Sequence, residues 1–229
     1  WAAEYAKRHF DGEAVVLDVG YPQPNTEARS RGFSDGLRDL PANQLTLLRV
    51  DGGAIRETAH QITADALTVH PDINIIFGIN DAHVLGALDA YRGAELDESR
   101  LLAVSFGLEG NGVKELMEQA HPYTISVAMF PELAGQACVD AAVCAYHQCP
   151  LPERIITPFA IVTPETLDDF YQRDDQTGEW HLNQARAEQL PTANTGLALL
   201  NQCRGRSKPK RIGYVGTFSS HEWYQNVYR

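Results

Sequence analysis

Two neighbouring polar residues, Asn80 and Asp81, stand where an almost continuous apolar run ends. The run covers residues 73–79, is interrupted only by Asn74, and is typical of a strand buried on both faces of a parallel sheet. Beyond Asp81 the apolar residues recur at helical spacing, and Gly86 is expected to let this helix approach the sheet closely. The amide and the carboxyl group are therefore predicted at the carboxyl end of a strand, where open α/β sheets bind ligands.

Two hydrogen-bonding side chains stand out near predicted element ends. Arg29, early in a predicted helix over residues 26–40, carries five fixed donors, and Asn80 carries both donors and an acceptor. Each also has a structural interpretation, since such an Arg often forms a surface ion pair and such an Asn often forms a turn. Asp81 is expected to cap the helix that follows, with ligand contact as the other role.

Motifs of catalysis and cofactor binding are not found in the sequence. Residues 107–112 follow a predicted strand, but their spacing is Gly-x-x-Gly-x-Gly, which differs from the dinucleotide fingerprint and indicates a turn. There is no nucleophile elbow, no P-loop and no His-Glu-x-x-His or paired Cys/His set. We therefore expect a protein that is not an enzyme and that needs neither a cofactor nor a metal.

The composition argues against a membrane-spanning protein and against a protein that binds nucleic acids. The chain has 229 residues, 44% of them apolar, and no apolar run approaches the 18 residues of a membrane span. Its formal charge of -11 argues against binding to the phosphate backbone of nucleic acids, and the basic cluster at residues 204–211 is interpreted as a solvated linker. The four cysteines lack a Cys-x-x-Cys pair and are expected to be buried structural thiols.

Predicted strands and helices alternate along most of the chain. Strands are expected at residues 14–19, 45–50, 73–79, 101–106 and 123–127, with helices at 26–40, 55–69, from 82, at 111–119 and at 131–146. Residues 155–162 are expected to form a returning strand or pair, followed by a short helix. Helical crossovers require a mostly parallel sheet, so the predicted fold class is α/β with a doubly wound sheet.

The last third of the chain lacks the regular alternation of predicted strands and helices. The predicted domains are residues 1–170, a linker with a short helix over 171–210, and the start of a second, truncated unit at 211–229, where residues 211–218 form a predicted strand. In the other interpretation the tail completes the first domain by permutation. Both ends run through predicted helices without caps, so we expect a fragment of a longer polypeptide.

Several motifs together resemble the ribose/galactose-type periplasmic sugar-binding proteins, whose fold the ligand domains of lactose-repressor-type regulators share. They are Ala-Arg-Ser-Arg-Gly-Phe at residues 28–33, His-Pro-Asp at 70–72, Asn80-Asp81 with Leu-Gly-Ala-Leu at 85–88, and Pro131 with Gly135. The resemblance covers roughly residues 1–167. It implies one lobe of a two-lobed protein that closes by a hinge around a ligand held between the lobes.

The resemblance also assigns ligand-binding residues. It implies that Arg29 and Asn80 contact ligand hydroxyls, while Gly107 stands where sugar binders commonly have an Asp and Met129 lies near the place of a Gln. The loss of both polar groups implies an altered, more apolar or differently substituted ligand. In the tail, the segment with His221, Trp223 and Tyr224 falls where the family carries an Asn-Pro-aromatic-aromatic segment. These three residues are therefore expected to line the ligand site of a second domain, although Trp223 and Tyr224 could instead form the inward face of its first helix.

The function implied by the resemblance is non-catalytic binding of a small polar ligand, a sugar by class, as the solute-binding component of an ABC-type uptake system. The expected partner is a membrane permease or receptor, and the expected location is extracytoplasmic. The alternative is the ligand-sensing domain of a transcriptional regulator or receptor, which for a regulator implies a cytoplasmic location. In neither interpretation does this stretch bind nucleic acid directly.

Overall fold

The computed structural model of the chain describes residues 1–53, 55–119, 121–190, 199–203, 205–213 and 227. The chain divides into two compact units, Trp1–Ser126 with Val162–Pro164, and Val127–Ile161 with Glu165–Arg229. The first unit carries the predicted ligand residues of the strand ends.

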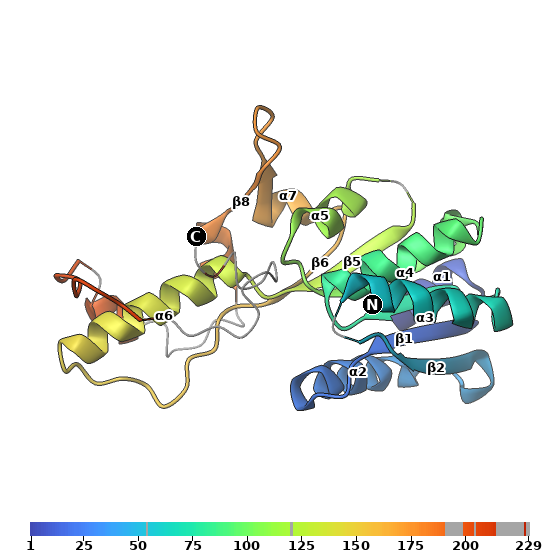
Figure 1. Cartoon of the computed structure of the whole chain (residues 1–229), viewed down its shortest axis with the longest axis horizontal. Helices are drawn as coiled ribbons and strands as arrows, with labels where there is room; N and C mark the ends of the chain where they lie inside the picture. Colours follow the sequence, from blue (N-terminus) through green and yellow to red (C-terminus); the bar gives the residue numbers. More distant parts are fainter. Residues whose placement is uncertain (54, 120, 191–198, 204, 214–226, 228–229) are drawn as a thin grey trace. The chain divides into compact units, whose positions relative to one another are not determined.

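The larger sheet has the strand order β2-β1-β3-β4-β5-β6. Strand β1 pairs in parallel with β2 and β3, and β3 pairs in parallel with β4, so the predicted doubly wound α/β sheet is confirmed (Figure 1). The strands are β1 (Ala14–Gly20), β2 (Leu45–Asp51), β3 (Ile75–Gly78), β4 (Leu102–Gly107), β5 (Tyr123–Ala128) and β6 (Ala160–Val162).

The helices of the first unit return the chain from one strand to the next. The α-helices are α1 (Ala2–His9), α2 (Pro24–Gly36), α3 (Arg56–Val69), α4 (Asp81–Gly93) and α5 (Asn111–Met117). Three short 3-10 turns supplement them: η1 (Leu37–Asp39), η2 (Ala42–Gln44) and η3 (Glu98–Arg100).

Two apolar clusters cover the two faces of the central strands. One contains Leu17 of β1 and Ile76 of β3, together with apolar residues of α3, α4 and α5. The other contains Val16 and Ile75, together with apolar residues of α1 and of the turn after α2. Because successive side chains of a strand point to opposite faces, both faces of these strands need apolar residues. This explains the nearly unbroken apolar run of β3.

Gly86 has a different role from the one expected. A Cβ atom on Gly86 would lie 2.3 Å from the carbonyl oxygen of Arg56 and 3.1 Å from the Cβ atom of Ala59, both on α3. The missing side chain therefore lets α4 approach α3, and not the sheet as predicted. The helical spacing of the apolar residues in α4 predicts that one face of the helix is buried, but it does not identify the element that packs on that face.

The second unit is built around the helix α6 (Pro131–Tyr146), whose bounds agree with the prediction. Its other elements are α7 (Leu167–Phe170), the antiparallel pair β7 (Tyr171–Arg173) and β8 (Trp180–Leu182), α8 (Gln184–Glu188) and the turn η4 (Asn201–Cys203). The segment at residues 171–210, expected to be a linker with a short helix, thus contains the short helix α8 and in addition a hairpin that was not expected. Of the strand or pair expected at residues 155–162, the structure contains only β6.

A disulfide joins Cys144 of α6 to Cys203 of η4, two residues separated by 59 positions in the sequence. Both sulfur atoms lie in a small apolar cluster with Ala137, Val143 and Leu200. The expectation of buried thiols is therefore wrong for this pair. Cys138 and Cys149 are free thiols, but Cys138 is exposed and Cys149 is half-buried, so the expectation of burial is wrong for them too. The strand predicted over residues 211–218 is absent from 211–213, and residues 214–218 lie outside the described residues.

Candidate functional site

Five residues from three segments meet where the parallel strands end. We call Arg29, Asn80, Asp81, Phe106 and Glu109 the crest cluster, because they lie at the carboxyl edge of the sheet, around the ends of β3 and β4. Arg29 comes from α2, Asn80 and Asp81 from the β3–α4 junction, and Phe106 and Glu109 from β4 and the loop after it. Arg29 and Asn80, the two residues for which the resemblance implies ligand contact, therefore lie at the same edge of the sheet, and the contact with ligand itself stays a prediction.

Arg29 is held in place by two contacts. Its Nη1 atom donates a hydrogen bond to the carbonyl oxygen of Ile79 at 2.7 Å, and its guanidinium lies 4.3 Å from the centre of the Phe106 ring. Burial lowers the pKa of Arg29, while the negative charges of Glu109 and Asp81 oppose that shift. A planar guanidinium stacked on an aromatic ring and fixed at one nitrogen presents its remaining N–H groups in a defined direction.

Asn80 caps α4. Its Oδ1 atom accepts a hydrogen bond from the backbone N–H of His83 at 2.9 Å, and its backbone is extended, as an N-cap residue requires. The cap was predicted one residue later, at Asp81, so that prediction is wrong. With its oxygen committed to the helix, the amide nitrogen of Asn80 is the group through which it could donate to a ligand.

Asp81 instead fixes the loop after β4. Its carboxylate accepts hydrogen bonds from the hydroxyl of Ser105 and from the backbone N–H groups of Glu109, at 2.6 Å, and Gly110, at 3.4 Å. Burial raises the pKa of Asp81, and these hydrogen bonds with the charge of Lys114 counteract the rise. The side chain is only 2% exposed. Its three donors give it a structural task, and a ligand contact by Asp81 stays a prediction.

The loop after β4 has an unusual backbone. Gly107 and Leu108 both have positive φ angles, 126° and 52°. A Cβ atom on Gly107 would lie 2.6 Å from Oε1 of Glu109, so the Glu109 side chain folds back into the space that a side chain at position 107 would need. Gly107 therefore serves this turn without a side chain of its own. Its predicted place beside the ligand is not tested by the structure.

A further charged side chain near this loop is that of Lys114, which lies outside the crest cluster. This buried lysine of α5 donates from Nζ to the carbonyl oxygen of Gly110 at 3.0 Å. Sequence reasoning missed both Lys114 and Glu109. The signal available was the glycine-rich loop itself, because glycines at a strand end often permit a turn that redirects neighbouring side chains.

The other predicted ligand residues lie elsewhere or outside the description. Met129 is half-buried in the second unit, between β5 and α6. His221, Trp223 and Tyr224 lie outside the described residues. Their predicted roles stay predictions.

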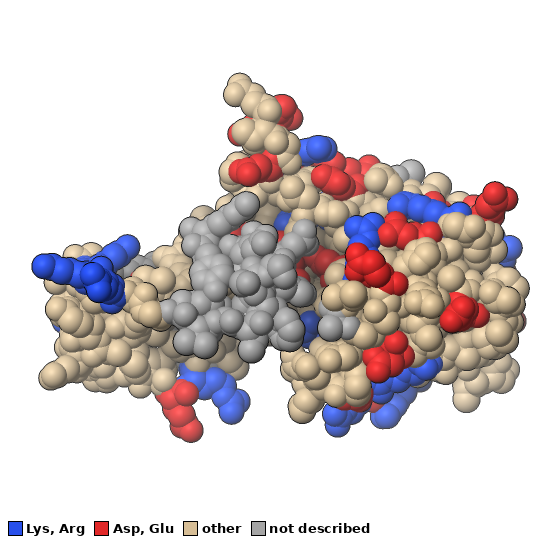
Figure 2. Space-filling view, in the orientation of Figure 1, with Lys and Arg blue, Asp and Glu red and all other residues tan. Residues whose placement is uncertain are grey.

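Neither a metal site nor a membrane span is found in the described part of the chain. His, Cys, Asp and Glu side chains do not gather there in groups of three or more that could hold a metal ion. Every helix described is too short or too polar to cross a lipid bilayer. Figure 2 shows acidic and basic side chains interspersed over one face of the first unit, and several pairs are joined, such as Arg56 with Asp89 at 2.7 Å.

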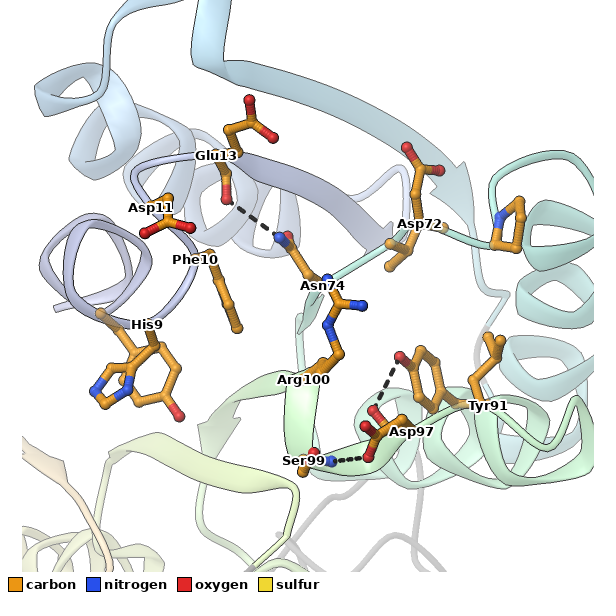
Figure 3. A pocket seen from close by; sticks show the side chains of 14 residues that line it. His9, Phe10, Asp11, Glu13, Asp72, Asn74, Tyr91, Asp97, Ser99 and Arg100 are labelled. Atoms are coloured by element: carbon orange, nitrogen blue, oxygen red, sulfur yellow. Dashed lines mark hydrogen bonds between the residues drawn. The ribbon is translucent and has the colours of Figure 1, made fainter.

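A cavity of about 650 Å³ lies at the opposite edge of the sheet (Figure 3). Residues directly before β1, β3 and β4 line it, including Glu13, Asn74 and Arg100. Several of its polar groups bond to one another: Asn74 Nδ2 donates to the Glu13 carbonyl at 3.1 Å, and the backbone N–H of Ser99 donates to Asp97 Oδ1 at 3.0 Å. None of the residues predicted to bind ligand lines this cavity, so the crest cluster is the candidate site.

Three solved structures illustrate the fold. They are a periplasmic solute-binding protein of an ABC transporter from Actinobacillus succinogenes 130z with bound D-allose (TM-score 0.65, 20% identity), a galactofuranose-binding protein (0.62, 19%), and a solute-binding protein of an ABC transporter from Bacillus halodurans C-125 with bound myo-inositol (0.63, 18%). The matches cover 74%, 73% and 72% of this chain and 59%, 58% and 56% of those chains. The chain thus spans less than two thirds of the length of these proteins.

Sequence comparison gives the family. No curated protein sequence matches the chain significantly. The family model described as "Periplasmic binding protein domain" matches residues 1–145, which is more than half of the 229 residues and includes the whole crest cluster. The strand order, the parallel pairing and the polar strand ends agree with this match. The chain belongs to the periplasmic binding protein domain family.

Proposed function

We propose that the full-length protein binds a small, polar, sugar-like ligand without transforming it, as the solute-binding component of an ABC-type uptake system. The ligand is held between this lobe and a second lobe, and the partner is a membrane permease. Family membership supports the binding role. The ligand class is suggested by the D-allose and myo-inositol bound in two of the similar structures and by the third, a galactofuranose-binding protein.

The observation that carries this proposal is the anchored guanidinium of Arg29. One nitrogen is bonded to Ile79 and the ring of Phe106 lies beneath the group, so the remaining N–H donors are oriented before any ligand arrives. Asn80 directly follows Ile79 in the sequence, and its amide nitrogen is a second donor group. Two neighbouring sets of fixed donors suit the oxygens of adjacent hydroxyl groups, and orientation in advance lowers the entropic cost of binding.

An extracytoplasmic location is part of the proposal. The disulfide between Cys144 and Cys203 supports it, because disulfides persist in oxidising compartments and are rare in the reducing cytosol.

The test is a ligand screen by isothermal titration calorimetry on the full-length protein. D-allose, D-galactose, D-glucose and myo-inositol are titrated in turn, and each mixture is analysed afterwards by chromatography. We expect saturable binding of at least one of them with the ligand recovered unchanged. Absence of binding across an extended panel of sugars and polyols would reject the ligand class, and a recovered product would reject binding without turnover.

A sensory domain is the second candidate. The fructose-binding periplasmic domain of a hybrid two-component system has a similar fold, with a TM-score of 0.61 and 18% identity. The two candidates differ in the effect of a gene deletion. Loss of a transport component abolishes uptake of the sugar that calorimetry identifies, whereas loss of a sensor leaves uptake intact and abolishes the transcriptional response to that sugar.

A further inference from the structure

Gly107 and Glu109 form a matched pair. The Glu109 side chain occupies the space of a side chain at position 107, with Oε1, Cγ and Cδ at 2.6, 2.7 and 2.9 Å from the position of a Cβ atom on Gly107. The backbone of Gly107, with φ at 126°, is also one that residues with side chains rarely adopt. The absence of a side chain at 107 thus allows a carboxylate from position 109 to lie against the end of β4.

This carboxylate lies near Arg29. It packs against Gly107, which directly follows Phe106, and the Arg29 guanidinium lies over the Phe106 ring. The negative charges of Glu109 and Asp81 accordingly oppose the lowering of the pKa of Arg29 by burial. Glu109 is 5% exposed and the guanidinium is half-buried, so water and salt screen their interaction less than they would at the surface. The positive charge of Arg29 is therefore balanced inside the protein before a ligand binds.

The charges around the loop balance as two pairs. Arg29 and Lys114 are positive, and Asp81 and Glu109 are negative, so the four formal charges sum to zero. Three hydrogen-bond donors and the charge of Lys114 favour the ionised form of Asp81, against the effect of its burial on the pKa. A ligand that brings its own negative charge would therefore meet an arginine already neutralised, and would approach the buried Glu109 carboxylate.

We propose that Glu109 is a specificity-determining residue that restricts the ligand to uncharged polyhydroxylated molecules and excludes sugar acids. Gly107 is the position that admits it. This inference rests on the proposed function, because it concerns selectivity among sugar-like ligands.

The test compares each neutral sugar with its own acid in the full-length protein. Calorimetry measures affinities for D-glucose and D-glucuronate and for D-galactose and D-galacturonate. The wild-type protein should bind a neutral sugar and should bind the matching acid at least about tenfold more weakly. In Glu109→Gln the ratio of acid to neutral affinity should rise at least about tenfold, because the side chain keeps its size and loses its charge.

Three further variants keep the test decisive. Glu109→Asp retains the charge and should retain the wild-type preference. Gly107→Ala should displace the Glu109 side chain and shift the ratio in the same direction as Glu109→Gln, which provides a second measurement if that variant folds poorly. Glu115→Gln makes the same charge change at an exposed position of α5 and should leave the ratio within about twofold of wild type.

The outcomes separate the two proposals. If no sugar or acid binds, the proposed function fails and this inference fails with it. If a neutral sugar binds but neither Glu109→Gln nor Gly107→Ala changes the ratio, Glu109 does not set selectivity, while the proposed function stands. Stronger wild-type binding of the acid than of the neutral sugar would also overturn the inference alone.

Discussion

Arg29 lies at the surface of its unit, so the binding role proposed for it can be tested separately from folding. Its guanidinium bonds to a backbone carbonyl and lies on Phe106 at the edge of the sheet, outside both apolar clusters. Removing the side chain therefore takes away the proposed ligand donors and leaves the core intact. The cost to folding is limited to one hydrogen bond and one ring contact.

Arg29→Ala should weaken binding of the sugar found in the ligand screen by about tenfold to a hundredfold, because a ligand oxygen loses a charged donor in a dry site. Calorimetry on the full-length protein measures the loss. Arg31→Ala, two positions further along α2 and exposed, is the matched control and should bind as wild type does. Equal affinity of Arg29→Ala and wild type, with a native circular dichroism spectrum, would remove Arg29 from the site.

His83 connects two strand ends through one buried ring. Its Nδ1 atom lies 3.0 Å from the carbonyl oxygen of Val19, and its Nε2 atom lies 3.0 Å from the carbonyl oxygen of Gly53. A neutral imidazole can donate to only one of these two acceptors. Burial lowers the pKa of His83, whereas the two carbonyl groups and the charge of Asp51 oppose the shift. The folded protein therefore holds this ring neutral at pH values where the unfolded chain already binds a proton.

This difference makes stability depend on pH. Below about pH 6.5, the ordinary pKa of histidine, the unfolded chain takes up a proton that folded His83 resists, so the free energy of unfolding falls as the pH falls. His83→Gln removes the titrating group and should flatten this part of the curve. Urea unfolding of both proteins between pH 5 and pH 8 measures it. Parallel curves for the two proteins would show that His83 does not contribute to the slope.

The residues of the crest cluster were predictable to different degrees. Arg29 and Asn80 could be placed near element ends from the sequence, because the apolar pattern shows where a helix begins and where a strand ends. Asp81 was assigned the cap that Asn80 makes, since Asn and Asp cap helices about equally well and the pattern does not separate neighbours. Glu109 was missed, because the glycine-rich loop signals a turn but the side chain that it redirects depends on two positive φ angles that the sequence does not reveal.

The helices and strands could largely be predicted from the sequence where the local apolar pattern agrees with the packing. The predicted helix at 131–146 matches α6, and the predicted strand at 45–50 matches β2 with one residue more. The strand predicted at 155–162 failed over most of its length, because apolar residues there, such as Ile155, pack on the cluster around α6 without extended pairing. The disulfide could not be predicted from local sequence patterns, because the two cysteines that it joins are 59 residues apart in the sequence.

The contact between α3 and α4 gives a test at the scale of elements. A Cβ atom at position 86 would lie 2.3 Å from the backbone of α3, so Gly86→Ala should force the helices apart and lower the free energy of unfolding by about 1 to 3 kcal/mol. Gly93→Ala is the matched control on the same helix. It meets no atom within 4 Å and should be neutral or stabilise by up to about 1 kcal/mol.

Urea unfolding measures both glycine variants under the same conditions. The contrast between them matters more than either value, because both replace Gly by Ala in α4. If Gly86→Ala were as stable as Gly93→Ala, the close approach of α3 and α4 would not be a requirement of the fold.

At the scale of the whole molecule, the proposed binding requires more protein than this chain contains. The chain spans about three fifths of the length of the similar solved proteins, and in the proposed function the crest cluster supplies donors from one side of the ligand. A sugar held on one side alone would keep much of its surface in water. High affinity therefore requires a second surface, which in the proposed function is the other lobe of the full-length protein.

Binding should consequently make the full-length protein more compact, because two lobes joined by a hinge close around a ligand that contacts both. Small-angle X-ray scattering with and without the sugar from the ligand screen should show a smaller radius of gyration in the saturated sample. The Arg29→Ala protein at the same sugar concentration is the control, and it should remain in the open form until the sugar concentration is raised by the factor that its affinity has lost. An unchanged radius of gyration in wild-type protein saturated with a tightly bound sugar would contradict hinge closure, and would indicate that this lobe holds its ligand against a partner that does not move.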